Sequence, residues 1–116
     1  MLNAQGRASD LYWMLEAIAI TTMGVPSEYF VELQLDIKER SPFKRTFVSE
    51  LANGWVGYVP TKKAFEQNMK DVPAERMARF DHKGYEVRSA LSQGYLPGIG
   101  EVMADKAVEL LKRLYG

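Results

Sequence analysis

Apolar and polar residues follow strand-like and helix-like periods in turn between residues 17 and 52. Residues 17–23 are largely apolar and rich in isoleucine and threonine, which is typical of a buried strand. Residues 27–41 carry apolar side chains at helical spacing, and residues 44–52 alternate as a strand does. A strand, a helix and a second strand in this order predict a βαβ unit, whose two strands run parallel with a right-handed crossover.

The expected helix has recognisable ends. Ser27 can accept hydrogen bonds from the free backbone N–H groups of the first turn, and Glu28 would place a carboxylate near the positive end of the helix dipole. Pro42 ends the helix, because a proline disfavours a helical conformation of the preceding residue. The apolar side chains at helical spacing are Phe30, Leu33 and Ile37.

The dipeptide Asn53-Gly54 supports an alternative to the parallel unit. Between apolar flanks, Asn-Gly strongly indicates a two-residue hairpin turn, which would make the flanking segments antiparallel neighbours. Gly57 would weaken so short a return strand, and Pro60 would end it. In the βαβ interpretation the same glycines follow the C-terminal end of a parallel strand, and composition alone does not decide between the two.

Helical and loop patterns dominate the second half of the chain. Thr61 can cap a short helix over residues 62–69, and the charged stretch 71–84 is typical of turns. Residues 85–92 are expected to form a third, short strand. After a loop rich in glycine and proline, a last helix is expected over residues 101–114. Its apolar stripe consists of Met103, Ala107, Leu110, Leu111 and Leu114.

Together these elements predict a single domain over residues 1–116 with an α/β fold. We expect a two-layer sandwich, in which a small sheet with a parallel βαβ unit packs against the 27–41 helix and the amphipathic C-terminal helix. Residues 1–12 are expected to form a loose lead-in, because they are mostly polar and aperiodic. In the second strand, alternation places Phe47, Ser49 and Leu51 on one face and Thr46, Val48 and Glu50 on the other.

Composition excludes several kinds of function. Fifteen basic residues balance fifteen acidic ones, so no basic excess favours binding of nucleic acid. The chain has no cysteine, and its single histidine, His82, excludes a self-contained metal site with several histidine ligands. His82 lies in a charged, turn-rich stretch and is more typical of an exposed loop. No segment resembles a signal peptide or a membrane span, so we expect the chain as given to be cytoplasmic.

Two polar side chains follow the C-terminal ends of the two expected parallel strands. Glu28 comes just after the first strand, and Tyr58 follows the second after the glycine-containing loop. Because ligands bind at this edge of open α/β sheets, we expect Glu28 and Tyr58 to lie close together. By residue type alone, Glu28 is more often a solvated carboxylate, and Tyr58 more often a side chain packed in a sheet.

The order of several short motifs resembles one family. The motifs are Pro26-Ser27-Glu28, the stretch NGWVGYVPT at 53–61, Gly84-Tyr85-Glu86-Val87, and Pro97-Gly98-Ile99-Gly100-Glu101 before a terminal amphipathic helix. This order is similar to that of the C-terminal part of the neutral/alkaline non-lysosomal ceramidases, especially their short bacterial members. The resemblance covers residues 16–115.

The resemblance implies zinc-dependent hydrolysis of the amide of N-acylsphingosine. In that family two histidines, a glutamate and a tyrosine hold the zinc, and the motifs match the glutamate to Glu28 and the tyrosine to Tyr58. Residues Asn53, Gly54, Trp55 and Gly57 would line the site, with Trp55 where a further tyrosine of the motif often stands. The family's Pro-Gly-Glu is Pro-Ser-Glu here, a change that retains the carboxylate.

The two histidine ligands and the catalytic serine of the family belong to an N-terminal region that does not match any part of this sequence, and His82 matches neither histidine motif. We therefore expect the chain alone to bind no stoichiometric zinc and to hydrolyse no N-acylsphingosine. Three interpretations remain open: a C-terminal part of a ceramidase-like amidohydrolase, a subunit that completes its site with a partner chain, and a non-catalytic α/β module.

Self-association is a further expectation. A sheet without the rest of its domain would expose an unpaired strand edge and apolar surface, and such surfaces recruit partners. A twofold homodimer is the commonest arrangement of this kind.

Overall fold

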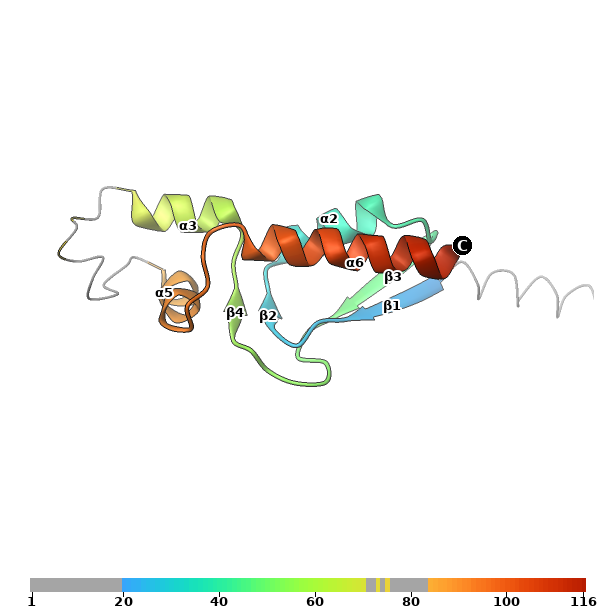
Figure 1. Cartoon of the computed structure of the whole chain (residues 1–116), viewed down its shortest axis with the longest axis horizontal. Helices are drawn as coiled ribbons and strands as arrows, with labels where there is room; N and C mark the ends of the chain where they lie inside the picture. The colour runs from blue at the N-terminus through green and yellow to red at the C-terminus, as the bar shows by residue number, and fades with distance from the viewer. Residues whose placement is uncertain (1–19, 71–72, 74, 76–83) are drawn as a thin grey trace, which may run out of the picture.

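The computed structural model describes residues 20–70, 73, 75 and 84–116. The lead-in expected over residues 1–12, the start of the first expected strand and His82 lie outside the described residues. The elements in chain order are β1 (Ile20–Gly24), β2 (Glu28–Tyr29), α2 (Val31–Arg40), β3 (Arg45–Ser49), β4 (Tyr58–Val59), α3 (Lys62–Met69), α5 (Tyr85–Ser92) and α6 (Ile99–Tyr115). They form the predicted small α/β fold (Figure 1).

Strands β1 and β3 pair in parallel, and the helix α2 lies between them in the chain. Their register places Thr22 opposite Phe47 and Gly24 opposite Ser49. The parallel βαβ unit is thus confirmed, and the hairpin at Asn53-Gly54 is wrong. The segment that follows β3 does not return along it, because β4 belongs to the second sheet.

That second sheet contains two very short parallel strands that the sequence pattern did not predict. In it, Glu28 of β2 pairs with Tyr58 of β4, and Tyr29 pairs with Val59. Two residues are too few for a period to be visible. Figure 1 shows β2 and β4 beside each other at the end of α6 where that helix begins.

The expected start of the first helix is corrected by this pairing. The backbone N–H of Glu28 donates to the Gly57 carbonyl at 3.0 Å, so residue 28 is extended rather than in a first helical turn. The helix begins later, after Phe30, whose side chain makes no capping hydrogen bond. Ser27 is therefore not a cap; its side chain is fully buried, and its hydroxyl has no hydrogen-bond partner among the described residues.

Residues 85–92 form the helix α5, so the third strand expected there is wrong. Val87 and Ala90 are both buried, and their three-residue spacing is that of one helix face. They pack against Phe65 of α3, which is fully buried. A short apolar run is ambiguous between strand and helix, and contact with α3 decides in favour of the helix here.

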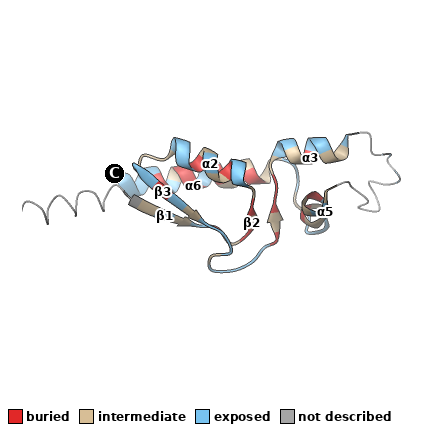
Figure 2. Ribbon diagram, turned by 180° about the vertical axis from the view of Figure 1, so that it is seen from behind, coloured by how far each residue is buried: buried red, intermediate tan, exposed pale blue. Residues whose placement is uncertain are grey.

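The main core lies between α6, α2 and the strands. Figure 2 shows buried residues along α6 and in β2 and β4. Of the predicted stripe on α6, Ala107 and Leu111 are buried, whereas Leu110 and Leu114 are 49% and 73% exposed. The burial of α6 is shifted toward the side that contacts α2. The core residues are Val25, Tyr29, Leu33, Ile37, Val59, Ala104, Ala107, Val108 and Leu111.

The sheet formed by β1 and β3 is buried on one face. Thr46 is buried and Val48 half-buried, whereas Arg45, Phe47 and Ser49 on the other face are exposed. The predicted alternation of β3 is confirmed, but its aromatic residue lies on the solvent side, where Phe47 is 57% exposed. Thr61 caps α3 as predicted, because its hydroxyl accepts from the backbone N–H of Ala64 at 3.1 Å.

Candidate functional site

The loop between β3 and β4 has an unusual backbone. Gly54 and Gly57 have φ angles of 151° and 88°, which favour glycine. Leu51 and Asn53 also have positive φ, at 52° and 62°. Such conformations are uncommon for residues with a side chain and cost about 1–3 kcal/mol each, so the surrounding contacts must hold them.

Those contacts are backbone hydrogen bonds to the segment between β1 and β2. Three loop N–H groups donate to its carbonyls: Leu51 to Ser27, Ala52 to Val25, and Val56 to Pro26. The last is the shortest, at 2.7 Å. In addition, the Tyr95 hydroxyl donates to the Val56 carbonyl at 2.8 Å. The loop is therefore fixed from both sides and presents Trp55 and Tyr58 in defined positions.

The structure brings Glu28, Trp55 and Tyr58 together. Glu28 and Tyr58 are register partners in adjacent parallel strands, so their side chains leave the same face of the pair. The indole N–H of Trp55 donates to Oε1 of Glu28, with 3.2 Å between nitrogen and oxygen. We call these three residues the Glu28 cluster. Of the other residues expected to line the site, Asn53 and Gly54 are exposed parts of the loop, and Gly57 is a buried part of it.

The Glu28 carboxylate also changes the pKa of the Tyr58 phenol. As a hydrogen-bond acceptor for the phenol and a nearby negative charge, it raises the pKa of Tyr58 to about 12, and desolvation acts in the same direction. Tyr58 is therefore neutral at physiological pH in the isolated chain. A cation bound at this position would have to compete with the phenolic proton.

An aromatic neighbour from α5 completes the surroundings of Tyr58. Tyr85 packs edge-on against Tyr58, with ring centroids 5.3 Å apart and an interplanar angle of 79°. The guanidinium of Arg88 lies 5.9 Å from the centre of the Tyr85 ring. The sequence pattern assigned no role to Tyr85, and residues 85–92 were expected to form a strand rather than the helix α5. The only signal for it was the Gly-Tyr-Glu-Val motif.

The donors of the Glu28 cluster do not suffice for a four-coordinate zinc site. A carboxylate and a phenol are two of the four ligands that protein zinc usually takes. Among the residues that the structure describes, no group of three or more histidine, cysteine, aspartate or glutamate side chains could hold a metal ion. The Glu28 cluster supplies two oxygen ligands, and we derive no reaction step through zinc.

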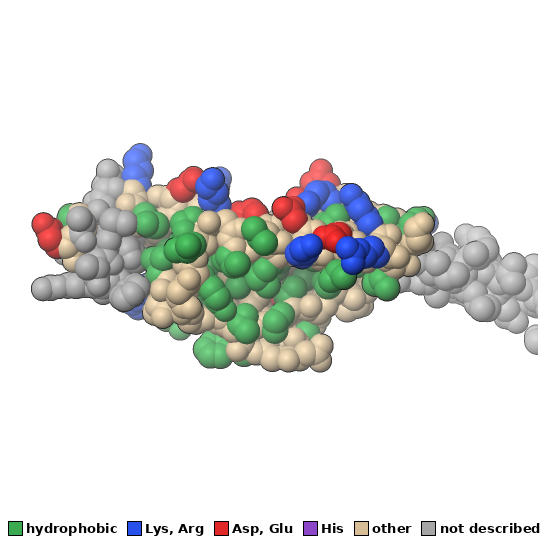
Figure 3. All heavy atoms as spheres, viewed as in Figure 1, with side chains coloured by type: hydrophobic (Ala, Val, Ile, Leu, Met, Phe, Trp, Pro, Cys, Tyr) green, Lys and Arg blue, Asp and Glu red, His purple; other side chains and the backbone are tan. Residues whose placement is uncertain are grey.

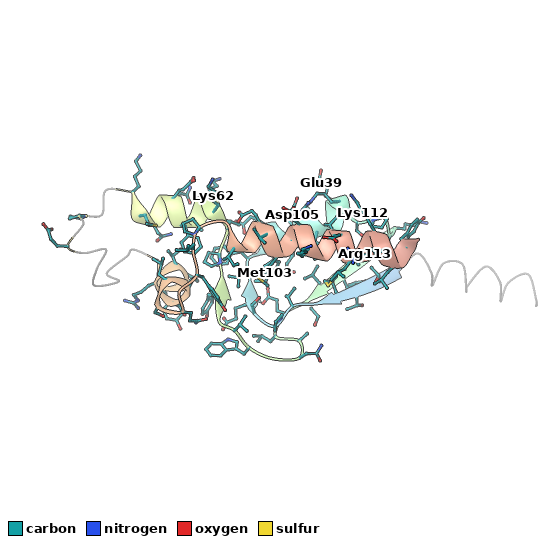
Figure 4. All side chains as sticks on the ribbon, viewed as in Figure 1. Glu39, Lys62, Met103, Asp105, Lys112 and Arg113 are labelled. Atoms are coloured by element: carbon teal, nitrogen blue, oxygen red, sulfur yellow. The ribbon has the colours of Figure 1, made fainter. Side chains whose placement is uncertain are left out.

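Several grooves of the described residues lie away from this cluster, and two of them differ in character. One, of about 440 Å³, runs between α2 and α6 and is lined mainly by charged side chains, including Asp36, Arg40 and Asp105. The other, of about 270 Å³, lies between β1 and α6, and its walls are mostly apolar. Figure 4 shows Met103 and Asp105 on α6, and the contacts place them in different surroundings: Met103 lines the apolar groove, and Asp105 binds Arg40 of α2.

Comparisons of the chain with family models, with curated proteins and with solved structures gave no match. Among the described residues, no helix combines the length and the apolar character needed to cross a membrane. Function therefore has to be argued from the geometry of the Glu28 cluster and from the exposed surfaces of the fold.

Proposed function

We propose that this chain supplies part of the active site of a zinc-dependent amidohydrolase similar to the neutral/alkaline ceramidases. The observation that carries the proposal is the pairing of Glu28 with Tyr58 across 30 residues of sequence. These two residue types are the oxygen ligands that the ceramidase resemblance implies. Zinc held there would polarise an amide carbonyl or activate a water molecule. The substrate class is the amide of an N-acylsphingosine.

In this proposal the remaining ligands, two histidines, and the catalytic serine come from another polypeptide segment. The small, partly uncovered sheet supports the proposal that this chain is one part of a larger domain. Parallel strands are nearly always covered on both faces, and two-stranded sheets are rarely stable alone. Here β1 and β3 form a parallel sheet of two strands, and Phe47 on its outer face is 57% exposed. A partner that adds strands and covers Phe47 would complete both the sheet and the site.

Co-purification with a partner that carries the two histidines and the serine tests the proposal. We expect the complex to hold one zinc per pair of chains and to hydrolyse N-acylsphingosine, whereas the isolated chain does neither. Glu28→Gln and Tyr58→Phe should each remove the zinc, which elemental analysis measures. Glu39→Gln is the matched control, because Glu39 is an exposed carboxylate on α2 (Figure 4). Full zinc occupancy in both variants would disprove the ligand assignment.

A second candidate function is that of a non-catalytic module that acts by self-association. Exposed apolar side chains favour it: Leu96, Val102 and Leu110 are 71%, 57% and 49% exposed. Figure 3 shows hydrophobic side chains gathered on the face that carries α6. In the first proposal, this apolar surface on α6 would instead bind the polypeptide segment that carries the two histidines. Solution mass together with metal content separates the two functions.

A further inference from the structure

The position of Trp55 is not explained by packing. Its side chain is 63% exposed, although tryptophan is the largest apolar side chain and normally contributes to a core or an interface. It belongs to neither of the two buried clusters of the described residues. Its indole Nε1 donates a hydrogen bond to Oε1 of Glu28. The indole is therefore held above a carboxylate rather than inside the protein.

The backbone has positive φ on both sides of Trp55, and at Asn53 this conformation is uncommon for a residue with a side chain. Asn53 and Gly54 precede it with positive φ, and Gly57 follows it with φ of 88°. The N–H of Val56, the next residue, donates to the Pro26 carbonyl, close to Glu28 in the chain. Strained backbone that neighbouring contacts hold in place is concentrated at functional sites. Here its effect is to bring an indole N–H to Glu28.

In the hydrogen bond between Trp55 and Glu28, the indole can only donate and the carboxylate can only accept. An indole offers one donor and no acceptor, and an ionised carboxylate only accepts. The bond from Trp55 therefore engages Oε1 of Glu28, and Tyr58 stands beside the same carboxylate as the register partner of Glu28 on the adjacent strand. Glu28 is half-buried, and a free glutamate side chain samples several rotamers. The indole N–H, held by the loop between β3 and β4, selects the Glu28 rotamer that faces Tyr58.

We propose that Trp55 is a positioning residue, whose indole N–H fixes the rotamer of the Glu28 carboxylate toward Tyr58. Partners of this kind orient carboxylates that bind metal ions, and their loss typically lowers metal affinity by about 10- to 100-fold. The use of the carboxylate for zinc rests on the proposed function. The positioning itself does not, and it can be measured in the chain without metal.

The experiment is nuclear magnetic resonance of the full chain with Trp13→Phe, which leaves Trp55 as the only indole. In this background, Trp55→Phe removes the donor, and Trp55→Tyr restores a hydroxyl on an aromatic ring. We expect the Hα–Hβ couplings of Glu28 to report one rotamer when Trp55 is present. The couplings should report averaged rotamers in the Trp55→Phe variant and a preferred rotamer again in the Trp55→Tyr variant.

The indole N–H resonance of Trp55 provides an independent readout, and it should shift in Glu28→Gln. Glu28 couplings unchanged in Trp55→Phe, or an indole resonance insensitive to Glu28→Gln, would overturn the proposal.

A second measurement separates this proposal from the proposed function. In the complex with the histidine-bearing partner, Trp55→Phe should lower zinc affinity about 10-fold. If the parent complex binds no zinc but the Glu28 couplings respond as expected, the zinc function fails and the positioning role stands. If zinc binds and Trp55→Phe changes neither the couplings nor the affinity, the positioning role fails and the zinc function stands.

Discussion

At the scale of single residues, Glu28 and Tyr58 derive their relationship from backbone pairing. The bond from the Glu28 N–H to the Gly57 carbonyl and the register of β2 with β4 fix both Cα positions. Their side chains then interact because adjacent strands lie about 5 Å apart. The electrostatic consequence is a phenol that ionises only at high pH.

The ionisation of Tyr58 can be predicted from this arrangement. Glu28 holds the pKa of Tyr58 at about 12, above the usual 10.0. This contribution to stability is fully present below about pH 10, the pKa of an unfolded tyrosine, and is lost as the pH rises through the folded-state value. Glu28→Gln removes the charge and should lower the pKa of Tyr58 toward 10. Ultraviolet absorbance of tyrosinate, with Tyr58→Phe subtracted, measures it; an unchanged value would contradict the contact.

Tyr29 illustrates a different use of a phenol. It is 2% exposed, and its hydroxyl donates to the Gly100 carbonyl at 2.7 Å, which ties β2 to the first turn of α6. Burial is the main cause that raises its pKa well above the usual range, followed by the charge of Glu101.

Tyr29→Phe should destabilise the fold by about 1–2 kcal/mol, because it removes a buried hydrogen bond. Denaturation in urea, followed by circular dichroism, measures the loss. Tyr95→Phe is the matched control: its hydroxyl also donates to a carbonyl, but in an exposed position, and should cost less. Equal losses in the two variants would show that burial of the bond does not matter.

At the scale of elements, the N-terminal end of α6 contacts α2, α3 and the end of β4. The backbone N–H of Lys62 donates to Glu101 at 2.7 Å, so a side chain of α6 satisfies the start of α3. Gly100 lies against α2 and the end of β4: a Cβ there would come within 2.5 Å of Leu33 and 2.9 Å of the Pro60 carbonyl oxygen. The glycine permits this close approach.

Gly100→Ala should therefore destabilise the protein, although alanine is intrinsically favoured in helices by about 1 kcal/mol. Contact with a backbone carbonyl cannot be relieved by a side-chain rotation, and overpacking of this kind typically costs about 1–3 kcal/mol. The urea midpoint measures the change. Leu114→Ala, on the exposed part of the same helix, should change stability by less than about 0.5 kcal/mol. Stabilisation by Gly100→Ala would show that α6 can move away from Pro60.

At the scale of the whole molecule, the described elements form two layers with an uncovered side. Helices α2 and α6 contribute to the core on one face of the β1–β3 sheet, while Phe47 faces solvent on the other. The apolar groove between β1 and α6 lies next to exposed Val102 and Leu110. Both features fit a fold that binds a further polypeptide.

We expect the isolated chain to associate with itself when no other partner is present. Sedimentation at high micromolar concentration should show species heavier than the 13.2 kDa of one chain. Phe47→Ser should reduce the association, because it removes apolar area from the uncovered sheet face. Leu35→Ser is the control, since Leu35 is equally exposed, at 57%, but lies on α2. A strictly monomeric parent chain would contradict this prediction.

The sequence by itself determined the elements whose period is long enough to detect. Three features could be predicted because each depends on residues close by in the sequence. They are the helix around Leu33 and Ile37, the alternation of Thr46 and Val48, and the Thr61 cap. The parallel crossover could also be predicted from the sequence, since a strand, a helix and a second strand in this order can pack together in few ways. Proximity of Glu28 and Tyr58 was predicted from strand ends, although the strands that pair them were not.

The tertiary structure alone decided the short and ambiguous segments. Backbone hydrogen bonds to Gly57 and Val59 make residues 28 and 29 extended, where local signals indicated a helix start. Packing of Val87 against Phe65 makes residues 85–92 helical, where residue types allowed a strand. The bond from Trp55 to Glu28 depends on a loop whose positive φ angles are held by residues 25–27. In each case contacts distant in sequence outweigh local preferences that differ by only about 1 kcal/mol per residue.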